Sequence, residues 1–255
     1  MNRNLSLGQY FPGHSILHRA DPRTKILLSV AFMVLALVSR RPAEFLTLGI
    51  FAVCAVFVSR IPLLLTLSAV KPILPLILFA SVVNLFMAPG RPLFRLWIFA
   101  PTYEGGAIAL AMAARILLIL LGGSALMIFT TTPILLTDGV EKLLKPLKRF
   151  GAPVHELSMM MTIALRFIPT LLEEADKIMR AQASRGADFN EGKLIDRARS
   201  FIPIIIPLFV SAFRRADELA NAMEARCYRG DEGRTRLREL CFGSLDAALF
   251  AAFGL

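Results

Sequence analysis

Residues that supply metal-binding and nucleophilic chemistry are scarce in this sequence. It has three cysteines and three histidines among 255 residues. Cys54, Cys227 and Cys241 are far apart, so they form neither a Cys-x-x-Cys pair nor a disulfide framework. His14 and His18 are four residues apart, but they lie in a Gly- and Pro-containing stretch that does not favour a metal pair. We therefore expect no metal site and no catalytic residue in this chain.

Acidic residues are almost absent from the first half of the chain. Before Asp138 the only ones are Asp21, Glu44 and Glu104, which are widely spaced. The alternative to a non-catalytic membrane protein is an intramembrane lipid-modifying enzyme, which would need clustered acids or histidines for metal binding or proton transfer. The sequence also lacks the Gly-x4-Gly-Lys-[Ser/Thr] phosphate-binding loop. It therefore carries no fingerprint of a nucleotide-binding site.

Charge of either sign is low for a soluble protein. The chain is 19% charged and 56% hydrophobic, with a mean hydropathy of +0.62, whereas soluble domains are about 25% charged. It nevertheless carries a net charge of +10. Residues 1–130 hold eleven basic and three acidic residues, and residues 131–255 hold eighteen and sixteen. The composition indicates a membrane protein, and the mixed charge of the second half does not favour nucleic-acid binding.

Long apolar runs in the first half predict membrane helices, because about 20 apolar residues cross the hydrocarbon core. We place these helices near residues 24–40, 43–60, 72–89 and 105–132. A short apolar piece at 61–70 lies among prolines and is either kinked or re-entrant. Arg115 lies inside the fourth run, so we expect it to face a partner helix or to reach the interface rather than contact lipid.

The start of the first apolar run has a helix-start pattern. Asp21 is expected to cap the helix, and Pro22 occupies the first helical position, where a missing N–H costs nothing. Arg23 and Lys25 then mark the cytoplasmic interface.

The second half lacks a convincing membrane span and instead predicts three amphipathic helices. The first lies near 139–149 and ends at Gly151, the second covers 154–184, and the third runs from about 192 to 226. Pro169 is expected to kink the second helix. The apolar run at 200–213 is too short to cross a membrane and is more typical of a buried or interfacial segment.

An internal repeat with an offset of 41 residues joins the last two helices. The copies read EADKIMRAQASRG from Glu174 and RADELANAMEARC from Arg215. Each copy ends with a small residue followed by an arginine, Arg185 or Arg226. Either each arginine binds a carboxylate on one of two similar partners, or it only complements the helix dipole.

Several segments resemble the T component of energy-coupling factor transporters, and the resemblance covers residues 8 to about 240. The segments are GQYFPG at 8–13, HRADPRTK at 18–25, AQASRG at 181–186 and AMEARCYRG at 222–230. The resemblance implies an all-α, polytopic membrane protein with about five transmembrane helices and a module of long amphipathic coupling helices. It assigns 1–132 to the transmembrane domain, 133–237 to the cytoplasmic module, and 238–255 to a short final transmembrane helix.

The family is a non-catalytic scaffold of ATP-driven importers for vitamins or transition-metal ions. It holds one substrate-binding S component against two ABC-type ATPases, which bind the ATP and magnesium, so no cofactor is expected in this chain. The resemblance implies a location in the bacterial or archaeal cell membrane, with lipid contacts and with the N-terminus and coupling helices in the cytoplasm. It also implies ATPase docking at two motifs: Ser184, Arg185 and Gly186, and Ala225, Arg226 and Cys227. The family's usual motif is Ala-Arg-Gly, so Ser184 and Cys227 are departures from it.

Overall fold

The structure, a computed structural model, describes residues 13, 15–87, 89, 91, 102–187, 200–230 and 241–254. Helices account for the regular structure in these ranges, and no strand occurs within them. The prediction of an all-helical protein is confirmed to that extent. The chain forms two units, Met1–Leu143 with Glu239–Leu255 and Leu144–Arg238, each of which is described by itself.

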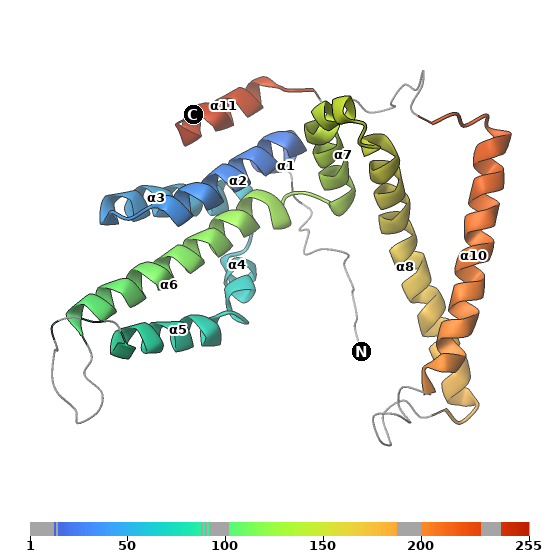
Figure 1. Cartoon of the computed structure of the whole chain (residues 1–255), viewed down its shortest axis with the longest axis horizontal. Helices are drawn as coiled ribbons and strands as arrows, with labels where there is room; N and C mark the ends of the chain where they lie inside the picture. The colour runs from blue at the N-terminus through green and yellow to red at the C-terminus, as the bar shows by residue number, and fades with distance from the viewer. Residues whose placement is uncertain are drawn as a thin grey trace. The chain divides into compact units, whose positions relative to one another are not determined.

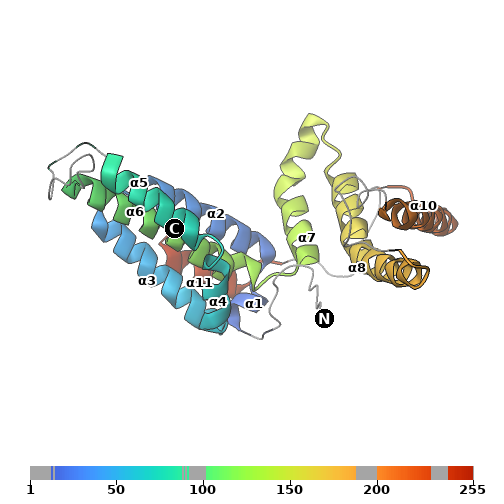
Figure 2. The ribbon, with the colours of Figure 1, turned by 90° about the horizontal axis from the view of Figure 1, so that it is seen from below.

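The first unit is a bundle of mostly apolar helices (Figures 1 and 2). In chain order these are α1 (Ile16–Arg19), α2 (Pro22–Val38), α3 (Pro42–Ser59), α4 (Leu63–Val70), α5 (Leu74–Met87), α6 (Tyr103–Gly123), the π-helical turn η1 (Ser124–Ile128), α7 (Pro133–Leu144) and α11 (Ser244–Phe253). The core lies among α2, α3, α6 and η1, where Phe32, Ala52 and Leu126 are buried. Gly122 lets α6 approach α2, because a Cβ at this position would collide with the ring of Phe32.

The predicted membrane segments coincide with α2, α3, α5 and the continuous α6–η1 helix. Pro42–Ser59 and Tyr103–Ile128 are long and apolar enough to cross a membrane, whereas Leu74–Met87 and Ser244–Phe253 are shorter apolar helices. The piece predicted at 61–70 is a separate eight-residue helix, α4, joined to α5 by a turn.

Arg115 on α6 faces a partner helix, as the sequence predicts. Its Nε donates to the carbonyl of Ala36 at 3.1 Å, and its Nη2 donates to the carbonyl of Ser39 at 2.7 Å. Its guanidinium also lies 5.7 Å from the ring centre of Phe45. These carbonyls lie at the end of α2, where no further turn of helix can bond them. The arginine therefore satisfies groups that would otherwise be costly to place in an apolar environment.

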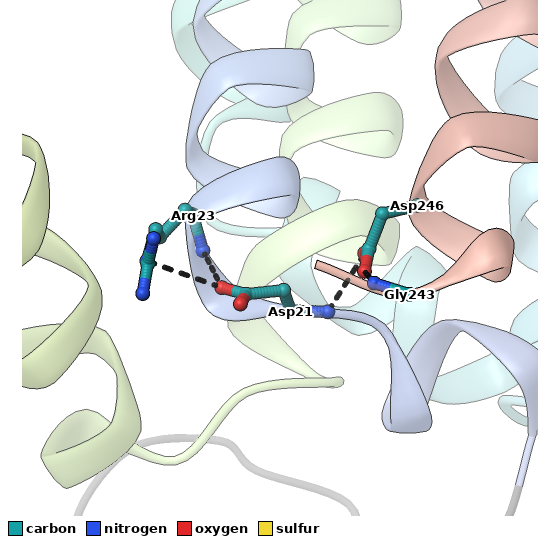
Figure 3. A network of polar contacts seen from close by, with 4 residues as sticks. All are labelled: Asp21, Arg23, Gly243 and Asp246. Atoms are coloured by element: carbon teal, nitrogen blue, oxygen red, sulfur yellow. Dashed lines mark hydrogen bonds and ion pairs between the residues drawn. The ribbon is translucent and has the colours of Figure 1, made fainter. Parts of the chain in front are cut away.

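The predicted cap at Asp21 is present, and a residue of the last helix, α11, hydrogen-bonds to the same residue (Figure 3). The Asp21 Oδ1 accepts the N–H of Arg23 at 2.9 Å, and Pro22 follows at the first helical position. The Asp246 carboxylate accepts the N–H of Asp21 at 2.9 Å and the N–H of Gly243 at 2.8 Å. Both aspartates are buried. One carboxylate therefore joins the starts of α2 and α11.

Lys25, in the first turn of α2, is hydrogen-bonded across the bundle. Its Nζ donates to the Thr130 carbonyl at 3.1 Å and to the Thr131 Oγ1 at 3.2 Å. The Lys25 side chain is buried, so it is a packed and hydrogen-bonded part of the bundle as well as a positive charge near its edge.

The second unit is built around two long helices. A 3-10 helix, η2 (Lys145–Phe150), ends at Gly151 with φ +81° and leads to α8 (Val154–Ser184). The bounds of α8 are those predicted from the sequence. The third predicted helix is present as α10 (Ile202–Ala225), and the part predicted at 192–199 lies outside the described residues. α8 and α10 run antiparallel, so the end of α10 lies beside the first half of α8 (Figure 1).

Candidate docking site at two helix ends

The two repeated arginines occupy the same position in helix geometry. Arg185 is the residue that ends α8, with φ −90° and ψ 7°. Arg226 ends α10 with φ −92° and ψ 12°. Both side chains are exposed, and neither makes an ion pair with another residue that the structure describes. The guanidinium groups are therefore available at the surface.

Both helix ends also share one hydrogen-bond pattern. At the end of α8, Gly186 donates to Ala183 and Ala187 donates to Gln182, each at 3.0 Å. At the end of α10, the equivalent bonds run from Cys227 to Glu224 at 2.9 Å and from Tyr228 to Met223 at 3.0 Å. This is the Schellman arrangement, in which the chain turns back to bond the last carbonyls of the helix.

The third residue of each motif lies in the left-handed region, as the Schellman turn requires. Gly186 has φ +87° and Cys227 has φ +56°. Glycine adopts this conformation without a steric penalty, whereas another residue pays about 1–2 kcal/mol. The geometry therefore explains why glycine suits the motif, and it makes Cys227 a strained departure.

The first residue of each motif has a small side chain, so little of it projects from the surface beside the arginine. Ala225 has only a methyl group, and the Ser184 hydroxyl donates to the carbonyl of Arg180 at 3.0 Å. Because this hydrogen bond stays within the helix, Ser184 does not compete for a partner's polar groups. Small residues at this position allow another surface to approach the helix end closely.

The repeat is inverted in space. Glu174 and Arg215, the first residues of the two copies, form an ion pair at 3.1 Å where α8 and α10 pack together. Because the helices are antiparallel, an approximate two-fold axis at this pair relates one copy to the other. The sequence contains one signal for this inversion: the equivalent positions 174 and 215 carry opposite charges, which can pair across such an axis.

The inversion places the two arginines at opposite ends of the helix pair. Arg226 and Ile163 line the same cavity, so Arg226 lies near the first half of α8. Arg185 lies 22 residues after Ile163 on α8, about 33 Å along the helix at 1.5 Å per residue. The six predicted docking residues thus form two separate sites, one at each end.

Comparison with known proteins agrees with this architecture. A family model described as a cobalt transport protein, CbiQ, matches residues 13–237. The energy-coupling factor transporter transmembrane protein EcfT of Ruminiclostridium cellulolyticum is 54% identical over 246 residues, which cover 96% of this chain and 92% of that protein. The chain belongs to the EcfT family. The EcfT of Acidaminococcus fermentans is 52% identical over 97% of this chain and 92% of its own, and that of Bacillus subtilis is 41% identical over 99% and 95%.

Membership of the EcfT family confirms the resemblance drawn from the sequence motifs. As an EcfT-type protein, the chain is a membrane protein and a non-catalytic component of an energy-coupling factor transporter. Docking by the two arginine motifs remains a prediction. The expected cytoplasmic position of the N-terminus and of the long helices also remains a prediction, as do the domain boundaries at 132 and 237.

Proposed function

We propose that this EcfT-type chain transmits movement from two cytoplasmic ABC-type ATPases to one S component during uptake of a vitamin or transition-metal ion. The observation that carries the proposal is the pair of identically capped arginine ends on one antiparallel helix pair. Two equivalent ends related by an approximate two-fold axis suit two similar subunits with matching symmetry. ATP and magnesium bind to those subunits and not to this chain.

The coupling is mechanical. Closure of the ATPases on ATP changes the separation of the surfaces that hold Arg185 and Arg226. Because the two arginines lie at opposite ends of the helix pair, that change rotates α8 and α10 about their contact at Glu174 and Arg215. The ATPases can drive this shift only if they hold the helix ends differently in their open and closed states.

The first half of α10 provides the surface for the S component. Phe209 and Phe213 are 60% and 67% exposed, and their rings pack one helical turn apart with centroids 6.3 Å apart. Exposed apolar side chains on one face of a helix mark a contact with a protein or with lipid. We place α8 and α10 in the cytoplasm and assign five membrane helices: α2, α3, α5, α6–η1 and the short α11.

The test replaces Arg185 and Arg226 with glutamate, singly and together, in the complete transporter of a bacterial cell. We expect each single variant to retain less ATPase on purification and the double variant to retain none and to lose uptake. Arg214→Glu is the matched control, because Arg214 is an exposed arginine of α10 away from both helix ends. Full assembly and transport by the double variant would refute the proposal.

A further inference from the structure

A cavity of about 680 Å³ lies between α8 and α10 at the Arg226 end. Its apolar wall comes from both helices and consists of Met159, Ile163, Phe167, Leu219 and Met223. Arg166 of α8 lines it together with Arg226 and Arg229, which follow the last turn of α10. The cavity is therefore apolar at its wall and positively charged around it.

The three arginines of this cavity have no acidic partner among the residues that the structure describes. No acidic residue of the described ranges lines the cavity, and none of the three arginines forms an ion pair within those ranges. By contrast, Arg215 is paired with Glu174 at the centre of the same helix pair. Three arginines that line one cavity favour the entry of an anion, and guanidinium geometry favours a carboxylate bound through two nitrogens.

The sequence positions equivalent to Arg166 and Arg229 in the other copy of the repeat are not basic. Under the 41-residue offset, Arg166 corresponds to Pro207 and Arg229 corresponds to Asp188 in the sequence. Only the central arginine of the motif is common to both ends. The Arg226 end therefore carries two arginines that the repeat does not reproduce at the equivalent positions of the other copy.

We propose that this cavity receives an acidic side chain, flanked by apolar ones, from the ATPase that docks at Arg226. Arg166 and Arg229 are then specificity-determining residues that distinguish this end from the Arg185 end. The proposal rests on the proposed function and adds a binding site on α8, outside the arginine motif itself. The carboxylate pairs with the arginines, while the apolar neighbours cover Phe167 and Met223.

The location of the partner can be tested by crosslinking in the assembled transporter. A photoreactive benzoyl-phenylalanine replaces Phe167, which lines the cavity, or Phe213, an exposed aromatic of α10 that does not line it. We expect the first to label an ATPase at an acidic segment and the second to label no ATPase. Labelling of lipid, of the S component or of this chain alone from position 167 would overturn the proposal.

The charge requirement can be tested with Arg166→Glu and Arg229→Glu, which leave both motif arginines in place. Loss of a charge-assisted pair weakens binding by on the order of tenfold to a hundredfold, so we expect the ATPase content of the purified complex to fall from two subunits towards one. Arg166→Ala, which keeps the helix and introduces no negative charge, should give a smaller loss. Arg214→Glu serves again as the control.

The outcomes separate this inference from the proposed function. If the Arg166→Glu and Arg229→Glu variants retain two ATPases while the Arg226→Glu variant loses one, the proposed binding role of the cavity is refuted. The scaffold role is then unaffected. Failure of the unaltered chain to bind any ATPase would refute the scaffold role itself. Circular dichroism of each purified variant, compared with the unaltered chain, checks that α8 and α10 are still helical.

Discussion

Replacing Cys227 with glycine is expected to stabilise the end of α10. Cys227 has φ +56°, which costs an L-residue about 1–2 kcal/mol relative to glycine. Glycine also makes the unfolded chain more flexible, which offsets about 0.5–1 kcal/mol of this stabilisation. The Cys227 side chain is exposed, so its removal leaves no buried cavity. We therefore expect a net stabilisation of about 0.5–1 kcal/mol.

Amide hydrogen exchange measures this change at the helix end itself. The N–H groups of Cys227 and Tyr228 are held by the carbonyls of Glu224 and Met223, so they exchange when the turn opens. A stabilisation of this size slows exchange about two- to fivefold after correction for sequence effects. The protection of amides in the middle of α10 should not change.

Gly186→Ala at the other helix end is the matched control. Its φ of +87° disfavours alanine, and a Cβ there would meet nothing within 4 Å among the described residues, so the penalty comes from the backbone conformation rather than from a clash with a neighbouring residue. We expect faster exchange at Gly186 and Ala187. Unchanged or faster exchange in Cys227→Gly, together with no effect of Gly186→Ala, would refute the argument that the left-handed turn shapes both motifs.

Three other predictions concern packing within each unit, and thermal unfolding of the purified chain in detergent measures them. Reversing the charges at both Glu174 and Arg215 should restore most of the stability that either single reversal loses. The expected coupling energy for this partly exposed pair is about 0.5–1 kcal/mol, and additive losses would contradict a direct ion pair. Gly122→Ala should destabilise by about 1–3 kcal/mol because α6 must move away from α2, and an unchanged midpoint would contradict their close approach. Asp246→Ala should lower stability by about 1–2 kcal/mol through loss of the cap shared by α2 and α11, whereas an equal loss in Asp246→Glu would argue that packing, not the carboxylate, is responsible.

Local sequence signals predicted the helices well, because those signals act within a few residues. Pro153 and Gly186 flank α8 closely, and both of its bounds followed from the sequence. The cap at Asp21 also followed, as did the position of Arg115 against a partner helix, because an arginine in an apolar run and a pre-proline aspartate each have few acceptable environments.

The features that the sequence did not predict depend on long-range pairing. Asp246 is an acidic residue in an apolar segment. Its role as the acceptor for the N–H of Asp21 is visible only in the folded structure. Periodicity also does not determine which side of α8 meets α10, so the repeat indicated two equivalent ends without showing that they are inverted. For the same reason, the position of Arg166 beside Arg226 could not be predicted.

The bond between Asp246 and Asp21 has a consequence for synthesis of the protein. The two residues are 225 positions apart, and a ribosome adds about 5–20 residues per second. The start of α2 therefore emerges roughly 10–45 seconds before its acceptor exists. During that interval the N–H of Asp21 must remain hydrated or be shielded by another group, so the start of α2, although made early, is among the last parts of the bundle to be completed.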